Sequence, residues 1–130
     1  MKIPLAFVIE DDEAIGEILM IALREARFQP VYIRNGKEAL EKLSGALPDL
    51  VVLDLHLPKL PGITVLRAIR SDTRLKHTRV MIVTADTVLA ENLRKEADLV
   101  LVKPVGFNQI REQAERLKHQ GNWSGAAVAV

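Results

Sequence analysis

The sequence predicts a doubly wound α/β fold, in which five parallel strands each precede a helix. Five short apolar runs occur along the chain, and four of them are continuous stretches of Val, Ile and Leu rather than alternating patterns. Continuous runs are typical of strands that helices cover on both faces. Between the runs, apolar residues recur at helical spacing. The chain has 130 residues, the size of a single domain with one sizeable core.

The first half of the chain contains two strand and helix pairs. Leu5–Ile9 predicts the first strand and Val31–Ile33 the second. Between them, an amphipathic helix is indicated by apolar residues at positions 15, 18, 19, 22, 23 and 26. Asn35 is a suitable N-cap for the second helix, which Gly45 and Pro48 bring to an end.

The second half repeats the pattern three times. The predicted strands are Leu50–Leu53, Val80–Val83 and Leu99–Val102. The helices that follow them are predicted after Gly62, within 87–97 and within 107–118. We predict one domain over residues 1–119, with residues 120–130 as a tail or the stub of a linker.

Composition narrows the class of protein. Lys and Arg together number 18 and Asp and Glu 17, so the net charge of +1 gives no reason to expect a nucleic acid or an anionic membrane as partner. The chain has no cysteine, which excludes disulfides and thiolate metal sites. Neither a signal peptide nor an apolar run of membrane-spanning length is present. We therefore expect a cytoplasmic domain.

Polar side chains follow four of the five predicted strands. The segments that carry them are Glu10-Asp11-Asp12 after the first strand, Asp54 after the third, Thr84-Ala85 at the end of the fourth and Lys103-Pro104 after the fifth. In open parallel sheets, ligands bind at the carboxyl ends of the strands, so these residues are expected to converge. Crowded carboxylates with no nearby His or Cys pair favour Mg²⁺. A carboxylate, a metal, a lysine and a hydroxyl are the parts needed to accept a phosphoryl group.

Four segments resemble the signatures of the response-regulator receiver family, and the resemblance covers about residues 4–119. The segments are Phe7-Val8-Ile9-Glu10-Asp11-Asp12, the stretch from Leu53 to Gly62, Val83-Thr84-Ala85 and Val102-Lys103-Pro104. The resemblance implies a flavodoxin-like fold with five strands. It also implies a two-component signalling switch, whose chemistry is limited to its own phosphorylation and dephosphorylation.

The resemblance also implies a role for each site residue. Asp54 would be the phosphoacceptor. Asp11, Asp54 and the backbone carbonyl of His56 would bind Mg²⁺ directly, with Glu10 acting through water. Thr84 would bind one phosphoryl oxygen and Lys103 would bind another. The small side chain of Ala85 would leave the phosphoryl group accessible. The Lys103-Pro104 peptide bond would be cis.

The implied partners are a histidine kinase or phosphotransfer protein as donor, an output partner that the sequence does not identify, and a second copy of the chain in a homodimer. Ile15 and Ile18, with Pro104 and Val105, are candidates for the surface that docks a kinase helix, although we assign Ile18 to the core. A basic stretch between Arg67 and Arg79 is interpreted as a solvated helix face rather than a nucleic-acid site.

Three departures from the family pattern concern the step after phosphorylation. Val100 stands three residues before Lys103, where receivers usually carry Tyr or Phe, and a stiff Val cannot swing between rotamers in the same way. The interval from Thr84 to Lys103 is 19 residues, about one helical turn short, and we place the shortfall in the fourth helix. The third is Glu96, which stands where the family usually has Gly.

Two other functions stay open. A pseudo-receiver that never turns over phosphate fits the altered residues around Val100. A phosphohydrolase with an Asp nucleophile would need a second Asp where His56 stands. The family also suggests that the side chains two positions after Asp54 and Thr84 tune dephosphorylation, and we expect these two, His56 and Asp86, to approach each other.

Overall fold

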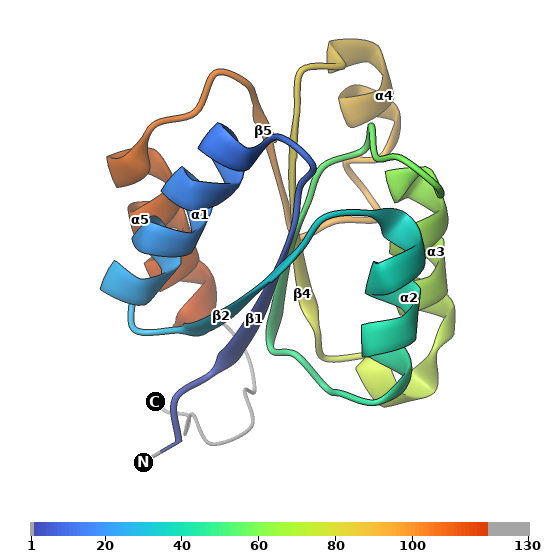
Figure 1. Cartoon of the computed structure of the whole chain (residues 1–130), viewed down its shortest axis with the longest axis horizontal. Helices are drawn as coiled ribbons and strands as arrows, with labels where there is room; N and C mark the ends of the chain where they lie inside the picture. Colours follow the sequence, from blue (N-terminus) through green and yellow to red (C-terminus); the bar gives the residue numbers. More distant parts are fainter. Residues whose placement is uncertain (1, 120–130) are drawn as a thin grey trace.

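The computed structural model describes residues 2–119 and shows strands and helices alternating along the chain (Figure 1). The first elements are β1 (Leu5–Ile9), α1 (Glu13–Glu25), β2 (Gln29–Ile33), α2 (Gly36–Ser44) and β3 (Leu50–Leu53). They are followed by α3 (Gly62–Ser71), the 3₁₀ turn η1 (Thr73–Leu75), β4 (Arg79–Thr84), α4 (Thr87–Asn92), β5 (Leu99–Val102) and α5 (Phe107–Lys118). The predicted tail, 120–130, lies outside the described residues.

The strands form one parallel sheet in the order β2-β1-β3-β4-β5. Helices α1 and α5 cover one face, and α2, α3 and α4 cover the other (Figure 1). The predicted doubly wound, flavodoxin-like fold is therefore confirmed. This order places the reversal of winding between β1 and β3, where the polar strand ends meet.

Strand β2 is two residues longer than the sequence predicts. It begins at Gln29 and includes Pro30, which has no N–H to donate to a neighbouring strand. Since β2 is an edge strand, it pairs only with β1, and proline is tolerated there. Strand β4 is also longer, by one residue at each end.

The sheet separates two apolar cores. Alternate residues of each inner strand point to opposite faces, so Phe7 and Ile9 join one core while Ala6 and Val8 join the other. The first core packs under α2, α3 and α4, and the second under α1 and α5. With both faces covered, the polar groups that the inner strands deliver to the site lie at or just past their carboxyl ends.

Local caps fix where two helices begin. The predicted N-cap, Asn35, accepts a hydrogen bond from the backbone N–H of Glu38 at 2.8 Å. Asp12 caps α1 by accepting from the N–H of Ile15 at 3.0 Å. Asp12 therefore serves the helix, which leaves its two neighbours, Glu10 and Asp11, for the site.

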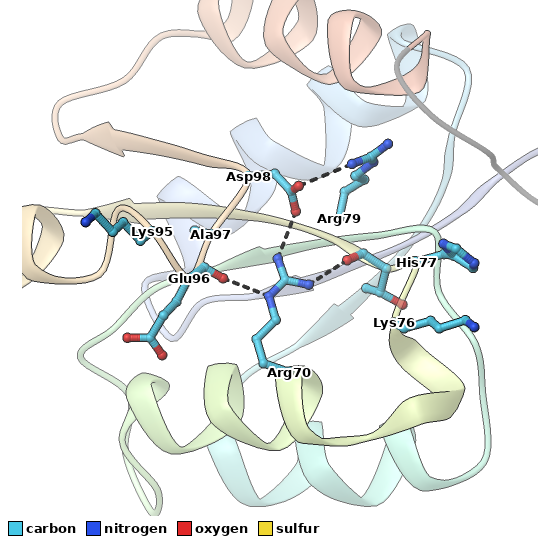
Figure 2. A pocket seen from close by; sticks show the side chains of 9 residues that line it. Arg70, Lys76, His77, Arg79, Lys95, Glu96, Ala97 and Asp98 are labelled. Atoms are coloured by element: carbon cyan, nitrogen blue, oxygen red, sulfur yellow. Dashed lines mark hydrogen bonds and ion pairs between the residues drawn. The ribbon is translucent and has the colours of Figure 1, made fainter.

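Helix α4 has only six residues, which agrees with the shortfall predicted for the fourth helix. The segment after it is held by Arg70 of α3, which donates to the carbonyl oxygen of Glu96 at 2.7 Å and to the carboxylate of Asp98 at 2.9 Å (Figure 2). Asp98 in turn accepts from the N–H of Val80 at 2.8 Å. The chain between α4 and β5 is thus anchored at its far end, away from the polar strand ends.

Candidate functional site

The ends of β1 and β3 bring three carboxylates together. Ile9 pairs with Leu53 in the sheet, so the residues that follow them, Glu10 and Asp54, emerge side by side. Glu10, Asp11 and Asp54 each offer an oxygen, and these oxygens lie within 4.8 Å of one another. Glu10 and Asp54 are buried, with 1% and 6% of their surfaces exposed, whereas Asp11 is open to solvent. A buried carboxylate pair requires a cationic partner.

Lys103 supplies the positive charge among these carboxylates. Its Nζ lies 3.0 Å from Oε1 of Glu10 and 3.4 Å from Oδ2 of Asp54. The lysine follows β5, which is separated from β3 by β4, so its long side chain reaches across the end of β4. The predicted convergence of Lys103 on Asp54 is present in the structure, and its contact with Glu10 is an addition that strand order alone does not indicate. The Lys103-Pro104 peptide bond is cis.

Thr84 and Ala85 lie at the end of β4, beside Asp54's strand. Thr84 is fully buried, and its hydroxyl oxygen accepts a hydrogen bond from the backbone N–H of Asp86 at 3.2 Å. Ala85 is exposed, and its small side chain leaves the approach to the strand ends open. A buried hydroxyl beside an open approach is suited to binding one oxygen of a tetrahedral anion.

His56 lies in the loop after β3. Its backbone N–H donates to Oδ1 of Asp54 at 3.3 Å, and its ring Nε2 lies 3.1 Å from Oδ2 of Asp86. The expected approach of His56 and Asp86 is confirmed. The imidazole is two-thirds exposed, so the pair bridges the outside of the site between the loop after β3 and the start of α4.

Burial and neighbouring charges together shift the pKa values of two groups in the site. Burial raises the pKa of Glu10 to about 7, and the charge of Asp54 adds to this, while hydrogen bonds from Lys103 and from the N–H of Asp12 oppose it. Burial acts to lower the pKa of Lys103, but Glu10 and Asp54 outweigh it, so the pKa lies above its usual value. One ammonium thus pairs with two of the three carboxylates, Glu10 and Asp54. Closely spaced oxygen ligands of this kind fit a small, hard divalent cation such as Mg²⁺.

The surface has two hollows outside the carboxylate cluster. One, of about 360 Å³, is lined by Ile15, Ile18, Lys103, Pro104 and Val105. The assignment of Ile18 to the core was wrong, since 40% of its surface is exposed. Ile18 lies three positions after Ile15 on α1. At this position its side chain lies beside the buried face of the helix rather than on it, and it faces the loop after β5.

The other hollow, of about 420 Å³, lies at the amino ends of β4 and β5, the edge of the sheet opposite Asp54 (Figure 2). Its arginines are engaged within the protein, because Arg70 and Arg79 both pair with Asp98. Elsewhere in the basic stretch, Arg67 pairs with Glu96 and Arg74 with Asp72. These pairs are consistent with a solvated structural face. No helix among residues 2–119 is long and apolar enough to cross a membrane.

Comparisons with known proteins point to one family. The family model "Response regulator receiver domain" matches residues 6–115. The chain is 35% identical over 97 residues to the DNA-binding response regulator MtrA of Mycolicibacterium paratuberculosis, covering 75% of this chain and 43% of that protein. It is 37% identical over 113 residues to the transcriptional regulatory protein QseB of Haemophilus influenzae, covering 85% and 50%.

Among solved structures, the response regulator TrrA of Thermotoga maritima, in complex with Mg²⁺ and BeF, superposes with a TM-score of 0.78 at 30% identity, covering 88% of this chain and 98% of that one. The chain spans about half the length of the curated relatives MtrA and QseB. Because MtrA is named as DNA-binding, the comparisons do not support the predicted absence of a nucleic-acid partner, which rests on this chain's charge alone.

The family match covers most of the chain, and receiver domains are signalling modules of two-component systems rather than classical enzymes. The chain belongs to the response regulator receiver domain family.

Proposed function

We propose that this domain accepts a phosphoryl group on Asp54 in a Mg²⁺-dependent reaction and passes the signal on through protein contacts. The donor is a histidine kinase or a phosphotransfer protein. The observation that carries the proposal is the meeting of the buried Asp54 with Glu10, Asp11 and Lys103 at the carboxyl edge of the sheet.

The residues divide the chemistry among them. A carboxylate oxygen of Asp54 attacks the phosphorus of the donor, so that an O–P bond forms as the donor's own bond to phosphorus breaks. Lys103, already 3.4 Å from Asp54, remains beside the new acyl phosphate and neutralises one of its oxygens. The hydroxyl of Thr84 donates to another oxygen, and the exposed Ala85 leaves room for the donor.

The metal fits the acidic side of the site. Asp11, Asp54 and the backbone carbonyl of His56 would hold Mg²⁺, with Glu10 acting through water. When bound, Mg²⁺ neutralises the charge that the carboxylates and the phosphoryl oxygens share. TrrA, a family member that forms a complex with Mg²⁺ and BeF, supports this assignment.

The donor is proposed to dock beside the site on the apolar hollow between α1 and the loop after β5. Ile15, Ile18, Pro104 and Val105 line it together with Lys103, so a helix seated there would lie next to the phosphoacceptor.

Phosphorylation is tested by mass. The protein is incubated with Mg²⁺ and a small acyl phosphate, and we expect the intact mass to gain one phosphoryl group in the wild type and none in Asp54→Asn. Binding of Mg²⁺ without an adduct would favour the pseudo-receiver, whose supporting observation is the buried, rigid Val100, 8% exposed. Turnover of many phosphomonoesters would favour the phosphohydrolase.

His56→Ala is expected to shorten the lifetime of the phosphoryl group several-fold. In the wild type, the bridge from His56 to Asp86 stands between solvent and the strand ends, so its removal admits water. Decay of the adduct is followed by intact mass after removal of the donor. Arg34→Ala, which breaks the exposed pair with Glu13 on the other side of the site, is the control and should leave the lifetime unchanged. An unchanged lifetime in His56→Ala would show that the bridge does not shield the acyl phosphate.

A further inference from the structure

The hollow at the amino ends of β4 and β5 gathers positive charge at the edge of the sheet opposite Asp54 (Figure 2). Its volume is about 420 Å³, and the side chains that line it with a positive charge are Arg70, Lys76, Arg79 and Lys95. Two carboxylates, those of Glu96 and Asp98, line it as well. The hollow therefore holds an excess of two positive charges, on a chain whose net charge is only +1.

The two arginines fix the floor of the hollow. Arg70 donates from Nε to the carbonyl oxygen of Glu96 at 2.7 Å and from Nη1 to that of Thr78 at 3.0 Å. Asp98 accepts from Arg70 at 2.9 Å and lies 3.3 Å from Arg79 (Figure 2). These bonds join the end of α3, the start of β4 and the segment before β5. The walls of the hollow are therefore preorganised for a ligand, which lowers the cost of binding.

Three exposed side chains on the rim take part in no ion pair within residues 2–119, and they are Lys76, His77 and Lys95. The neighbouring arginines of the basic stretch, Arg67 and Arg74, each have a carboxylate partner. The first two rim residues lie in the turn before β4 and the third in the segment after α4. Figure 2 shows them on opposite sides of Arg70, so the rim presents positive charge from two directions.

Helix dipoles do not account for these rim cations. A cation in the last turn of a helix interacts favourably with the unpaired carbonyl groups there, and Arg70 has such a place in α3. Lys76 and His77 follow a 3₁₀ turn of only three residues. Lys95 lies three positions beyond Asn92, the last residue of α4, and the dipole effect falls off within one turn. Cations gathered around one hollow repel one another, and a bound anion relieves that repulsion.

The lining of the hollow suits a peptide better than a nucleic acid. Among the described residues, no Phe, Tyr or Trp lines it, so unpaired bases have no ring on which to stack. A nucleic-acid backbone carries a charge at every phosphate, and its phosphates would meet Glu96 as well as the lysines. The carboxylate of Glu96 is 37% exposed, and the residue follows Lys95 directly. A peptide can place a carboxylate against each lysine and an uncharged residue against Glu96.

We propose that this hollow docks an acidic peptide segment of a partner protein. Carboxylates of the segment pair with Lys76 on one rim and with Lys95 on the other, and the segment lies over the floor that Arg70 holds in place. The hollow lies at the opposite edge of the sheet from Asp54, so this inference does not depend on the proposed phosphorylation.

The test uses a peptide of alternating Glu and Ala with blocked ends, and a matched peptide with Gln in place of every Glu. Backbone N–H signals of the ¹⁵N-labelled protein are followed by NMR. At about 0.05 M salt, we expect the Glu peptide to shift the signals of Lys76, His77 and Lys95, and the Gln peptide to shift none of them. Because exposed charges are screened by salt, the affinity should fall several-fold at about 0.5 M salt.

Charge reversal on the rim separates the hollow from the net charge of the protein. Lys76→Glu and Lys95→Glu should each weaken binding of the Glu peptide about fivefold or more. Lys37→Glu is the matched control, because Lys37 is an exposed lysine on α2 that lies outside the hollow and takes part in no ion pair within residues 2–119. Its affinity should stay within about twofold of the wild type. Unchanged signals far from each substitution show that the variants fold.

Four results would overturn the proposal. Equal binding of the Gln peptide would remove the role of the carboxylates, and an equal loss in Lys37→Glu would show that net charge alone governs binding. Tighter binding of a DNA oligonucleotide with the same number of charges would make the hollow a nucleic-acid site. Self-association of the wild type that Lys95→Glu abolishes would assign the hollow to a second copy of the chain.

Discussion

Gly62→Ala is expected to destabilise the domain by about 3 kcal/mol, at the upper end of the cost of overpacking. A Cβ at Gly62 would lie 2.6 Å from Cα of Leu55 and closer still to the carbonyl oxygen of Asp54. Both are backbone atoms, which cannot turn aside as a side chain can. The N–H of Gly62 also donates to the carbonyl of Leu55 at 2.9 Å, so the start of α3 is held against the chain that carries Asp54.

Urea unfolding of the wild type and the variant measures this cost. Gly45→Ala is the control, because a Cβ there meets no atom within 4 Å, and its free energy of unfolding should stay within about 0.5 kcal/mol of the wild type. Relief of the clash must move Asp54 or α3. The folded fraction of Gly62→Ala should therefore also give a lower yield of the phosphorylated protein than the wild type does. Equal stabilities for the two variants would show that α3 yields at no cost and that Gly62 does not position Asp54.

The sequence predicts that the third helix begins after Gly62, but it does not show why this residue must be glycine. The predicted strand boundaries and helix starts followed from apolar runs and caps, which depend on neighbours in the chain. The close approach of α3 to Asp54 is a contact in space that no local pattern encodes. The convergence of Asp54 and Lys103 could be predicted because the carboxyl ends of parallel strands share one edge of the sheet.

Other details of the site escaped prediction for the same reason. The reach of Lys103 to Glu10 depends on how its side chain crosses β4, and the exposure of Ile18 depends on where the loop after β5 lies. The approach of His56 and Asp86 was predicted from the family rather than from the spacing. The cap that Asp86 provides to α4 is a local pattern that the sequence shows, but its link to Thr84 appears only in the structure.

Without Mg²⁺, the free energy of unfolding should fall as the pH rises from 5 to 8, because of Glu10. Its pKa is about 7 in the folded protein, against a usual value of 4.5. A carboxyl group with a raised pKa adds stability in full below its unfolded pKa and loses it as the pH rises through the folded pKa. The loss attributable to Glu10 is on the order of 3 kcal/mol, and its cause is the burial of a charge beside Asp54.

Mg²⁺ should reverse this dependence. The ionised form of Glu10 dominates above pH 7, and a cation among the three carboxylates stabilises that form, so Mg²⁺ should raise the free energy of unfolding more at pH 8 than at pH 6. Urea unfolding at pH 6 and at pH 8, each with Mg²⁺ or with a chelator, measures the four free energies of unfolding. In Glu10→Gln the fall between pH 5 and 8 should largely disappear, since glutamine does not ionise. If the variant keeps the full pH dependence, the titrating group is not Glu10, and the acidic pocket is neutralised by Lys103 alone.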